Sequence, residues 1–264
     1  MKTPRRWAAG VEYLGTAYRG WQRQTGLAAV QAEVESALSA IADHPVSVYA
    51  AGRTDAGVHA FQQVVHFDSG AMRTPYAWLL GGNGRMKPDV SLRWVQEVPA
   101  DFHARHSAIE RSYRYVIHVS ASRSALLQGR VAWHTRELDA AAMHQAAQAL
   151  VGEHDFSAFR DSECQSPSPM RNLRRASVRA SGEFVVLEVS ANAFLHHMVR
   201  NIAGSLLEVG QSKRDIAWIG ALLRGRERTQ AGMTAEAAGL YFIGPTYPAE
   251  FALPPLPQAW FPPL

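Results

Sequence analysis

The chain alternates between segments with a helical hydrophobic pattern and segments with a strand-like one. Apolar residues recur every three or four positions between residues 30 and 41, which predicts one buried helix face there. The same spacing predicts helices at 74–82, at 139–151, at 195–209 and at 215–224. Stretches rich in β-branched and aromatic residues predict strands at 7–14, 46–50, around 64–67, 89–97, 113–119, 173–179, 184–190 and 240–244.

The order of these elements is nearly the same in both halves of the chain. Each half reads as strand, helix, strand, strand, helix, strand, so the sequence predicts an α+β chain with two ferredoxin-like halves, 1–104 and 105–264. RNA-recognition modules use this same architecture. Between the predicted elements of the second half, residues 162–169 hold two prolines and three serines and are expected to form a long surface loop. The proline-rich tail from Pro245 onward is expected to run over the surface in extended form.

Composition places this chain among globular proteins. Of its 264 residues, 47% are hydrophobic and 19% charged, which is unlike a disordered chain. No stretch approaches the roughly 18 apolar residues that span a bilayer, and no signal-peptide pattern follows the basic N-terminus. Cys164 is the single cysteine, which excludes an internal disulfide and a zinc site built of thiolates. Together these features predict a cytoplasmic protein without a membrane partner.

Almost all of the positively charged residues of the chain are arginines. The net charge is +4, the isoelectric point is about 9.4, and 24 of the 27 basic residues are arginines. Because the planar guanidinium group pairs with phosphate and stacks on bases, this bias is typical of RNA-binding proteins. A GC-rich genome produces the same bias through its codons, so composition leaves both explanations open.

The segment AGRTDAGVHA at residues 51–60 is the strongest candidate for chemistry. It lies between two predicted strands and contains two glycines, which allow a tight backbone and the close approach of a ligand. A carboxylate at Asp55 could project from such a loop into a cleft, with Arg53 two residues away. By itself the pattern favours an ordinary turn, since aspartate is common before Ala-Gly in turns.

This segment resembles the signature of the tRNA pseudouridine synthase A family, and six further blocks extend the resemblance over nearly the whole chain. They are YRGWQRQ at 18–24, VVHF at 64–67, DFHAR at 101–105, RSYRY at 111–115, NAFLHHMVRNI at 192–202 and EAAGLY at 236–241. One departure is NGRMKPD at 83–89, where similar proteins carry fewer cations and place the proline differently.

The resemblance implies a fold, an activity and a partner. The implied fold is that of pseudouridine synthases, with the two halves joined around a mixed, mainly antiparallel sheet and a central cleft. The implied reaction converts uridine to pseudouridine at positions 38, 39 and 40 in the anticodon stem-loop of tRNA. It requires no cofactor and no metal. The resemblance further implies a homodimer whose basic cleft takes one tRNA across both subunits.

The resemblance also assigns roles to three catalytic candidates. Asp55 is the expected nucleophile, Arg200 is expected to pair with its carboxylate, and Tyr113 is expected to stack on the target uracil. An opposite charge near a partly buried carboxylate keeps it ionised, as a nucleophile must be. From the residues alone, Arg200 could equally be a solvated helix residue at the edge of an apolar stripe. Tyr113 could be a core residue like Tyr115, which shares its strand face.

Several basic residues are expected to bind the RNA substrate. Arg53 is expected to enter the RNA stack and hold the target base outside it, because base chemistry requires extrusion of the base. A structural salt bridge to Asp55 is the alternative. His59, Arg160, Arg171 and Arg174 complete the predicted substrate-binding set, although the arginines around 162–169 could equally belong to a plain solvated loop.

Two other functions compete with this assignment. The first is a non-catalytic RNA-binding protein on the same paired units, but binding alone does not require a carboxylate in a basic groove. The second is a metal-dependent hydrolase that uses some of the eleven histidines. His103/His106 and His196/His197 are close in sequence, yet neither pair forms a His-Glu-x-x-His pattern, and three metal ligands are not assembled.

Overall fold

The computed structural model describes residues 4–256 and divides the chain into two compact units. The first unit contains the residues up to Ile109 together with the segment that begins at Phe242, and the second spans Glu110–Tyr241. The chain thus returns to the first unit within strand β10 (Leu240–Thr246). The first unit therefore includes a segment from the C-terminal part of the chain. The expected division into halves 1–104 and 105–264 stays a prediction.

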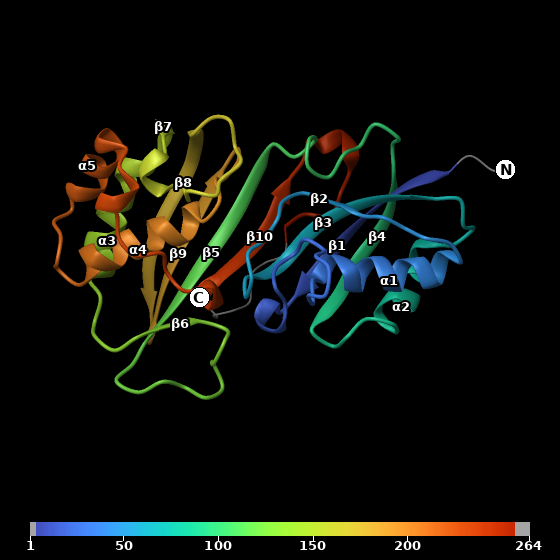
Figure 1. The fold of residues 1–264 in the computed structure, drawn as a ribbon, viewed down its shortest axis with the longest axis horizontal. Coiled ribbons are helices and arrows are strands. Elements are labelled where there is room, and N and C mark those ends of the chain that lie inside the picture. Colours follow the sequence, from blue (N-terminus) through green and yellow to red (C-terminus); the bar gives the residue numbers. More distant parts are fainter. Residues whose placement is uncertain (1–3, 257–264) are drawn as a thin grey trace. The chain divides into compact units, whose positions relative to one another are not determined.

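The first unit is built on β1 (Arg5–Tyr13), which lies between β3 (His59–Ser69) and β4 (Val90–Val98) and is antiparallel to both (Figure 1). The short β2 (Tyr49–Ala50) pairs with β3, as does β10. The order β4-β1-β3-β2 is the order of a ferredoxin-like sheet. Helices α1 (Val30–Ala42) and α2 (Pro75–Asn83) pack on each other and on β4.

Both faces of this sheet are covered, which explains why β1 and β3 are buried along almost their whole length. On the helix face, Trp7 and Phe67 are register partners, and both rings contact Trp78 of α2, with centroids 6.0 and 5.2 Å away. On the opposite face, Val64 packs in a cluster with Phe102 and Phe251.

The second unit holds the strands β5 (Glu110–Val119), β9 (Phe184–Ala191), β8 (Met170–Ser181) and β7 (Gly152–Asp155), antiparallel in that order. The short β6 (Ala132–His134) runs parallel to β5. Helix α3 (Ala140–Ala147) packs on β8 and on α4 (Met198–Gly210), and α5 (Trp218–Gly225) contacts α3. Short 3-10 turns lie at Gly15–Ala17, Gln148–Leu150, Ser157–Phe159, Arg228–Gln230, Ala237–Gly239 and Ala249–Phe251.

The predicted α+β class with mainly antiparallel strands is confirmed, but three details of the prediction are wrong. The strand expected at 46–50 is reduced to Tyr49–Ala50, because the Val46 and Val48 N–H groups donate to the Ser39 and Glu35 side chains of α1 and not to a strand. The helix expected to reach residue 151 ends at Ala147 and continues only as a 3-10 turn. Strands β6 and β7 had no predicted counterpart, because three or four residues carry too little periodicity.

Residues 160–169 contain neither helix nor strand, so the loop expected at 162–169 is confirmed. Of the tail expected to be extended, Ala249–Phe251 forms a 3-10 turn, and residues 257–264 lie outside the described residues. No helix within residues 4–256 has both the length and the apolar character needed to cross a membrane.

Candidate active site

The loop that carries Asp55 is attached to β3 where it begins. The Ala51 N–H donates to the Val64 carbonyl at 2.8 Å, and the Gln63 side-chain amide donates to the Gly52 carbonyl at 2.7 Å. These bonds extend the contact with β3 past the short β2. The loop therefore leaves the sheet in one fixed direction.

Thr54 anchors the loop immediately before Asp55. Its hydroxyl shares a buried hydrogen bond of 2.8 Å with the Tyr13 hydroxyl, and its carbonyl accepts from the Trp21 N–H at 3.0 Å. Gly20 brings the Trp21 segment this close: its φ is +95°, and a Cβ there would lie 2.6 Å from the Thr54 carbonyl oxygen. Only glycine combines this backbone angle with this approach.

The loop is also held immediately after Asp55. The Gly57 N–H donates to the Tyr18 carbonyl at 3.2 Å, and the Val58 N–H donates to the carbonyl of Asp55 itself at 3.2 Å. Nδ1 of His59 accepts from the Gly15 N–H at 2.9 Å, and His59 is only 1% exposed. This burial favours a role in holding the loop over direct contact with RNA. Asp55 stays partly exposed between two fixed neighbours.

Arg53 lies on the same loop and is exposed. The alternative salt bridge to Asp55 does not form, since the Arg53 guanidinium makes no hydrogen bond or ion pair with any residue from 4 to 256. This leaves all five of its N–H donors available to a ligand.

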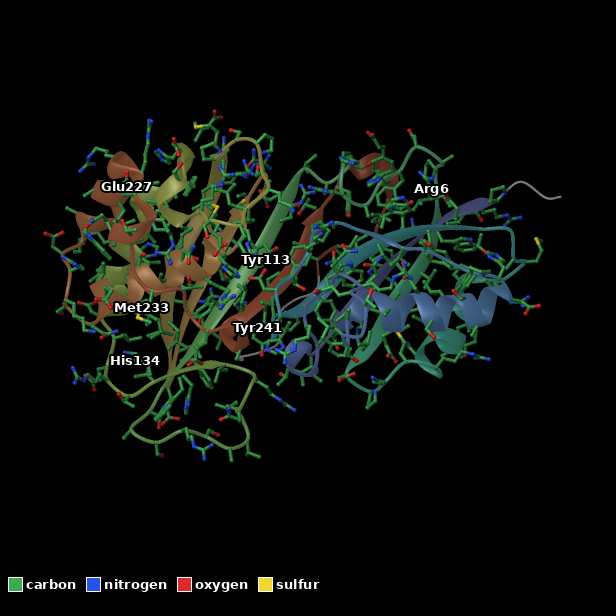
Figure 2. The ribbon with its side chains drawn as sticks, viewed as in Figure 1. Arg6, Tyr113, His134, Glu227, Met233 and Tyr241 are labelled. Carbon is green, nitrogen blue, oxygen red and sulfur yellow. The ribbon has the colours of Figure 1, made fainter. Side chains whose placement is uncertain are left out.

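In the second unit, Tyr113 and Tyr115 share a face of β5 but have different surroundings. Figure 2 shows Tyr113 on this strand. Tyr115 is fully buried and donates to the Glu236 carbonyl at 2.9 Å, and burial raises the pKa of its phenol. Tyr113 is partly exposed, and its ring meets Phe194 edge to face with centroids 4.9 Å apart. Tyr115 is therefore a core residue, while part of the Tyr113 side chain is accessible.

Arg200 lies in the first turn of α4 and is partly buried. Its Nε donates to the Ala235 carbonyl at 2.8 Å, and the Ala235 N–H donates back to the Arg200 carbonyl at 3.1 Å. This reciprocal pair fixes the base of the side chain against the segment before β10. That Arg200 pairs with Asp55 stays a prediction.

The turn before α4 is strained and is held by an acid that the sequence did not single out. His197 precedes the helix with φ at +59°, a conformation rare outside glycine. Its Nδ1 lies 2.7 Å from a carboxylate oxygen of Asp161, and His196 Nδ1 lies 3.4 Å from the other. Burial raises the pKa of Asp161, but the Glu163 N–H and the two histidines outweigh it and hold that pKa below its usual value.

The three arginines predicted around the loop at 162–169 all bond within their own unit. Arg160 donates to the Cys164 and Ser166 carbonyls at 2.8 and 2.7 Å. Arg171 donates to three groups of residues 166–170, and Arg174 forms an ion pair with Glu110 at 3.2 Å. Arg160 and Arg171 therefore shape the loop itself, which neither composition nor motif indicated.

The comparisons with known proteins agree with the blocks quoted above. The family model described as tRNA pseudouridine synthase matches residues 9–107 and 146–248, stretches that include Asp55 and Arg200 but not Tyr113. A relative named "tRNA pseudouridine synthase A" from Aeromonas salmonicida (strain A449) is 54% identical over 257 residues, 97% of this chain and 96% of that protein.

Two further relatives carry the same name. The protein from Aeromonas hydrophila is 53% identical and covers 97% of this chain and 96% of its own length. The protein from Hydrogenovibrio crunogenus is 51% identical over 247 residues, 94% of each chain. With identity at or above half along nearly the full length, and with the family model matching both units, this chain belongs to the tRNA pseudouridine synthase family.

Proposed function

We propose that this chain isomerises uridine to pseudouridine at positions 38, 39 and 40 in the anticodon stem-loop of tRNAs, with Asp55 as the nucleophile. A tRNA pseudouridine synthase is an isomerase. The observation that carries the assignment of Asp55 is the geometry of its loop. Backbone bonds fix the residues on both sides, and the carboxylate between them stays partly exposed. A nucleophile held this way loses little freedom when it meets its substrate.

The reaction breaks the bond between uracil N1 and ribose C1′ and forms one between C5 and C1′. A proton leaves C5 and N1 gains one, so no electron and no water is consumed. A carboxylate suits this exchange because it can add covalently and then leave again. Arg200 is proposed to pair with Asp55 and keep it ionised, and Tyr113 is proposed to stack on the extruded uracil.

The remaining roles concern the RNA. Arg53, exposed beside Asp55, is proposed to enter the stack in place of the extruded base. Arg160, Arg171 and Arg174 are proposed to contact phosphates with the N–H groups that their present bonds leave over. His59 was predicted to bind the substrate. Because it is buried, we propose that it acts indirectly, by holding the loop that carries Asp55 in position.

The assembly and the location complete the proposal. A homodimer with one tRNA bound across both subunits is proposed from the family resemblance, and a cytoplasmic location follows the substrate. The molar mass of the purified chain, measured by light scattering with and without tRNA, tests the dimer. A monomer in both samples would refute it.

The experiment that tests the activity compares Asp55→Asn with Asp215→Asn. Asn keeps the size of the side chain and removes its charge, and Asp215 is an exposed carboxylate on the second unit that serves as a matched control. Asp55→Asn is expected to bind tRNA like the parent and to form no pseudouridine, whereas Asp215→Asn keeps full activity. Mapping of pseudouridine in tRNA from cells with and without the gene identifies the positions. Appreciable turnover by purified Asp55→Asn would sink the assignment.

A further inference from the structure

Two arginines of the first unit stand apart from the rest. Of its nine arginines, six bond through their guanidinium groups within residues 4–256: Arg5, Arg6, Arg23, Arg73, Arg85 and Arg93. Arg105 has an interaction of its own as well. Arg19 and Arg53 are exposed, and no described residue bonds to either guanidinium. Both belong to the segments that hold Asp55 in place, Arg53 on the loop and Arg19 on the segment bonded to it.

Arg19 also lines a hollow beside the loop at residues 51–60, which is the catalytic loop of the proposed function. Its neighbours Thr16, Ala17 and Tyr18 form one wall, and Ala56 and Gly57, the residues directly after Asp55, form the other. The hollow measures about 370 Å³, within the range of sites that take small ligands or parts of larger ones. The bond from the Gly57 N–H to the Tyr18 carbonyl joins the two walls, so the hollow is attached to the loop that carries Asp55.

The lining selects the chemistry of the ligand. A nucleobase requires a ring face on which to stack, but Tyr18 is only 4% exposed and its hydroxyl donates to Asp89 at 2.6 Å. The polar group that the hollow offers is the Arg19 guanidinium with its five N–H donors. These donors suit a phosphate oxygen. A phosphate this close to Asp55 also requires a cation, because the carboxylate would otherwise repel it.

We propose that this hollow binds a backbone phosphate next to the target uridine, with Arg19 as its cation. This inference rests on the proposed function. It adds a phosphate subsite at the catalytic loop to the contacts already assigned, and it gives Arg19 a role distinct from that of Arg53. Arg53 serves the extruded base, whereas Arg19 fixes the RNA backbone from which that base is extruded.

The test is a double-mutant cycle between the side chain and the phosphate. tRNAs are assembled by ligation with one neutral methylphosphonate at each phosphate flanking positions 38, 39 and 40, and their dissociation constants are measured for the parent, Arg19→Ala and Arg93→Ala. Arg93 is the control, since it is 59% exposed and lines no part of the hollow. Arg19→Lys is included because it keeps the charge without the planar fork.

For the parent, one flanking methylphosphonate is expected to weaken binding by about tenfold, the loss typical of a charge-assisted hydrogen bond. Arg19→Ala should bind the natural tRNA about tenfold more weakly and lose no more than about twofold further at that same phosphate. Its plot of log affinity against log salt should be shallower by about 0.7 to 0.9, the slope of one phosphate contact. Arg19→Lys should keep the parent's slope. Arg93→Ala should lose affinity at that phosphate as the parent does.

If the losses from Arg19→Ala and from the methylphosphonate multiply at every flanking position, the inference is wrong. This failure is distinct from failure of the proposed function, because the binding cycle does not depend on turnover. If Asp55→Asn is inactive and the losses multiply, only the role proposed for Arg19 is refuted. If Asp55→Asn is active, the proposed function is refuted, whatever the result of the double-mutant cycle.

Discussion

Gly20, on the segment that packs against the loop carrying Asp55, has no side chain to take part in chemistry, yet it should be among the positions most sensitive to substitution. Gly20 has φ at +95°, and a Cβ there would lie 2.6 Å from the Thr54 carbonyl oxygen. Gly26 also has a positive φ, +73°, yet a Cβ there would meet nothing within 4 Å. The pair Gly20→Ala and Gly26→Ala therefore separates backbone strain from displacement of the loop.

The expected magnitudes follow from these distances. The positive φ alone costs an alanine about 1–2 kcal/mol, and both variants should lose this much stability. A carbon and a carbonyl oxygen normally approach no closer than about 3.3 Å, so in Gly20→Ala the Thr54 oxygen must retreat by roughly 0.7 Å. Overpacking of this kind adds about 1–3 kcal/mol. Because Thr54 adjoins Asp55, and a misplacement of about 1 Å can cost about 100-fold in rate, a loss approaching that size is expected.

The assay is the single-turnover rate of pseudouridine formation at saturating enzyme, measured at a temperature where urea unfolding shows both variants to be folded. Gly26→Ala should stay within about threefold of the parent, since a Cβ at Gly26 meets no atom within 4 Å and displaces nothing. If a folded Gly20→Ala matches Gly26→Ala in rate, the segment at Gly20 does not position Asp55.

Two further predictions concern the core of each unit. In the first, burial, together with nearby His103 and Arg6, lowers the pKa of His66 to about 4, below its ordinary 6.5. The folded protein therefore binds a proton at His66 less readily than the unfolded chain does. The stabilisation that neutral His66 gives is complete above pH 6.5 and is lost as the pH falls toward 4. This loss lowers the free energy of unfolding by about 3 kcal/mol, at 1.36 kcal/mol per pKa unit. His66→Asn should remove that part of the acid slope in urea unfolding, and an unchanged slope would refute the assignment. In the second, Tyr115→Phe removes a buried hydrogen bond and should cost about 1–2 kcal/mol of stability with turnover intact, whereas Tyr113→Ala removes the ring proposed to stack on the uracil and should lower turnover in the folded variant. Equal turnover in the two variants would contradict the role given to Tyr113.

The sequence by itself determined the elements with strong periodicity and pointed to the loop at 51–60 as the candidate for catalysis. The helix at Val30–Ala42 and the strand at His59–Ser69 follow from their apolar spacing, because spacing determines which face of an element is buried. The signature at 51–60 predicted Asp55 as the nucleophile before any geometry was known, and the family model and the relatives agree with the family that it indicated.

Only the tertiary structure decided which partner each of these residues meets. Val46 and Val48 read as strand residues, yet side chains of α1 take their N–H groups, since burial by itself does not specify a hydrogen-bond partner. Tyr113 and Tyr115 are equivalent by pattern and differ only because Glu236 and its neighbours cover one of them.

The arginines show the same division most clearly. The sequence contains 24 arginines, but composition does not distinguish an arginine that bonds within a loop from one that is available to a ligand. Arg160 bonds to carbonyls of its own loop, whereas the Arg19 guanidinium, beside Gly57 in the wall of its hollow, bonds to no residue from 4 to 256. A guanidinium pairs with whatever the fold brings within about 3 Å of it, and that distance depends on segments far apart in the chain.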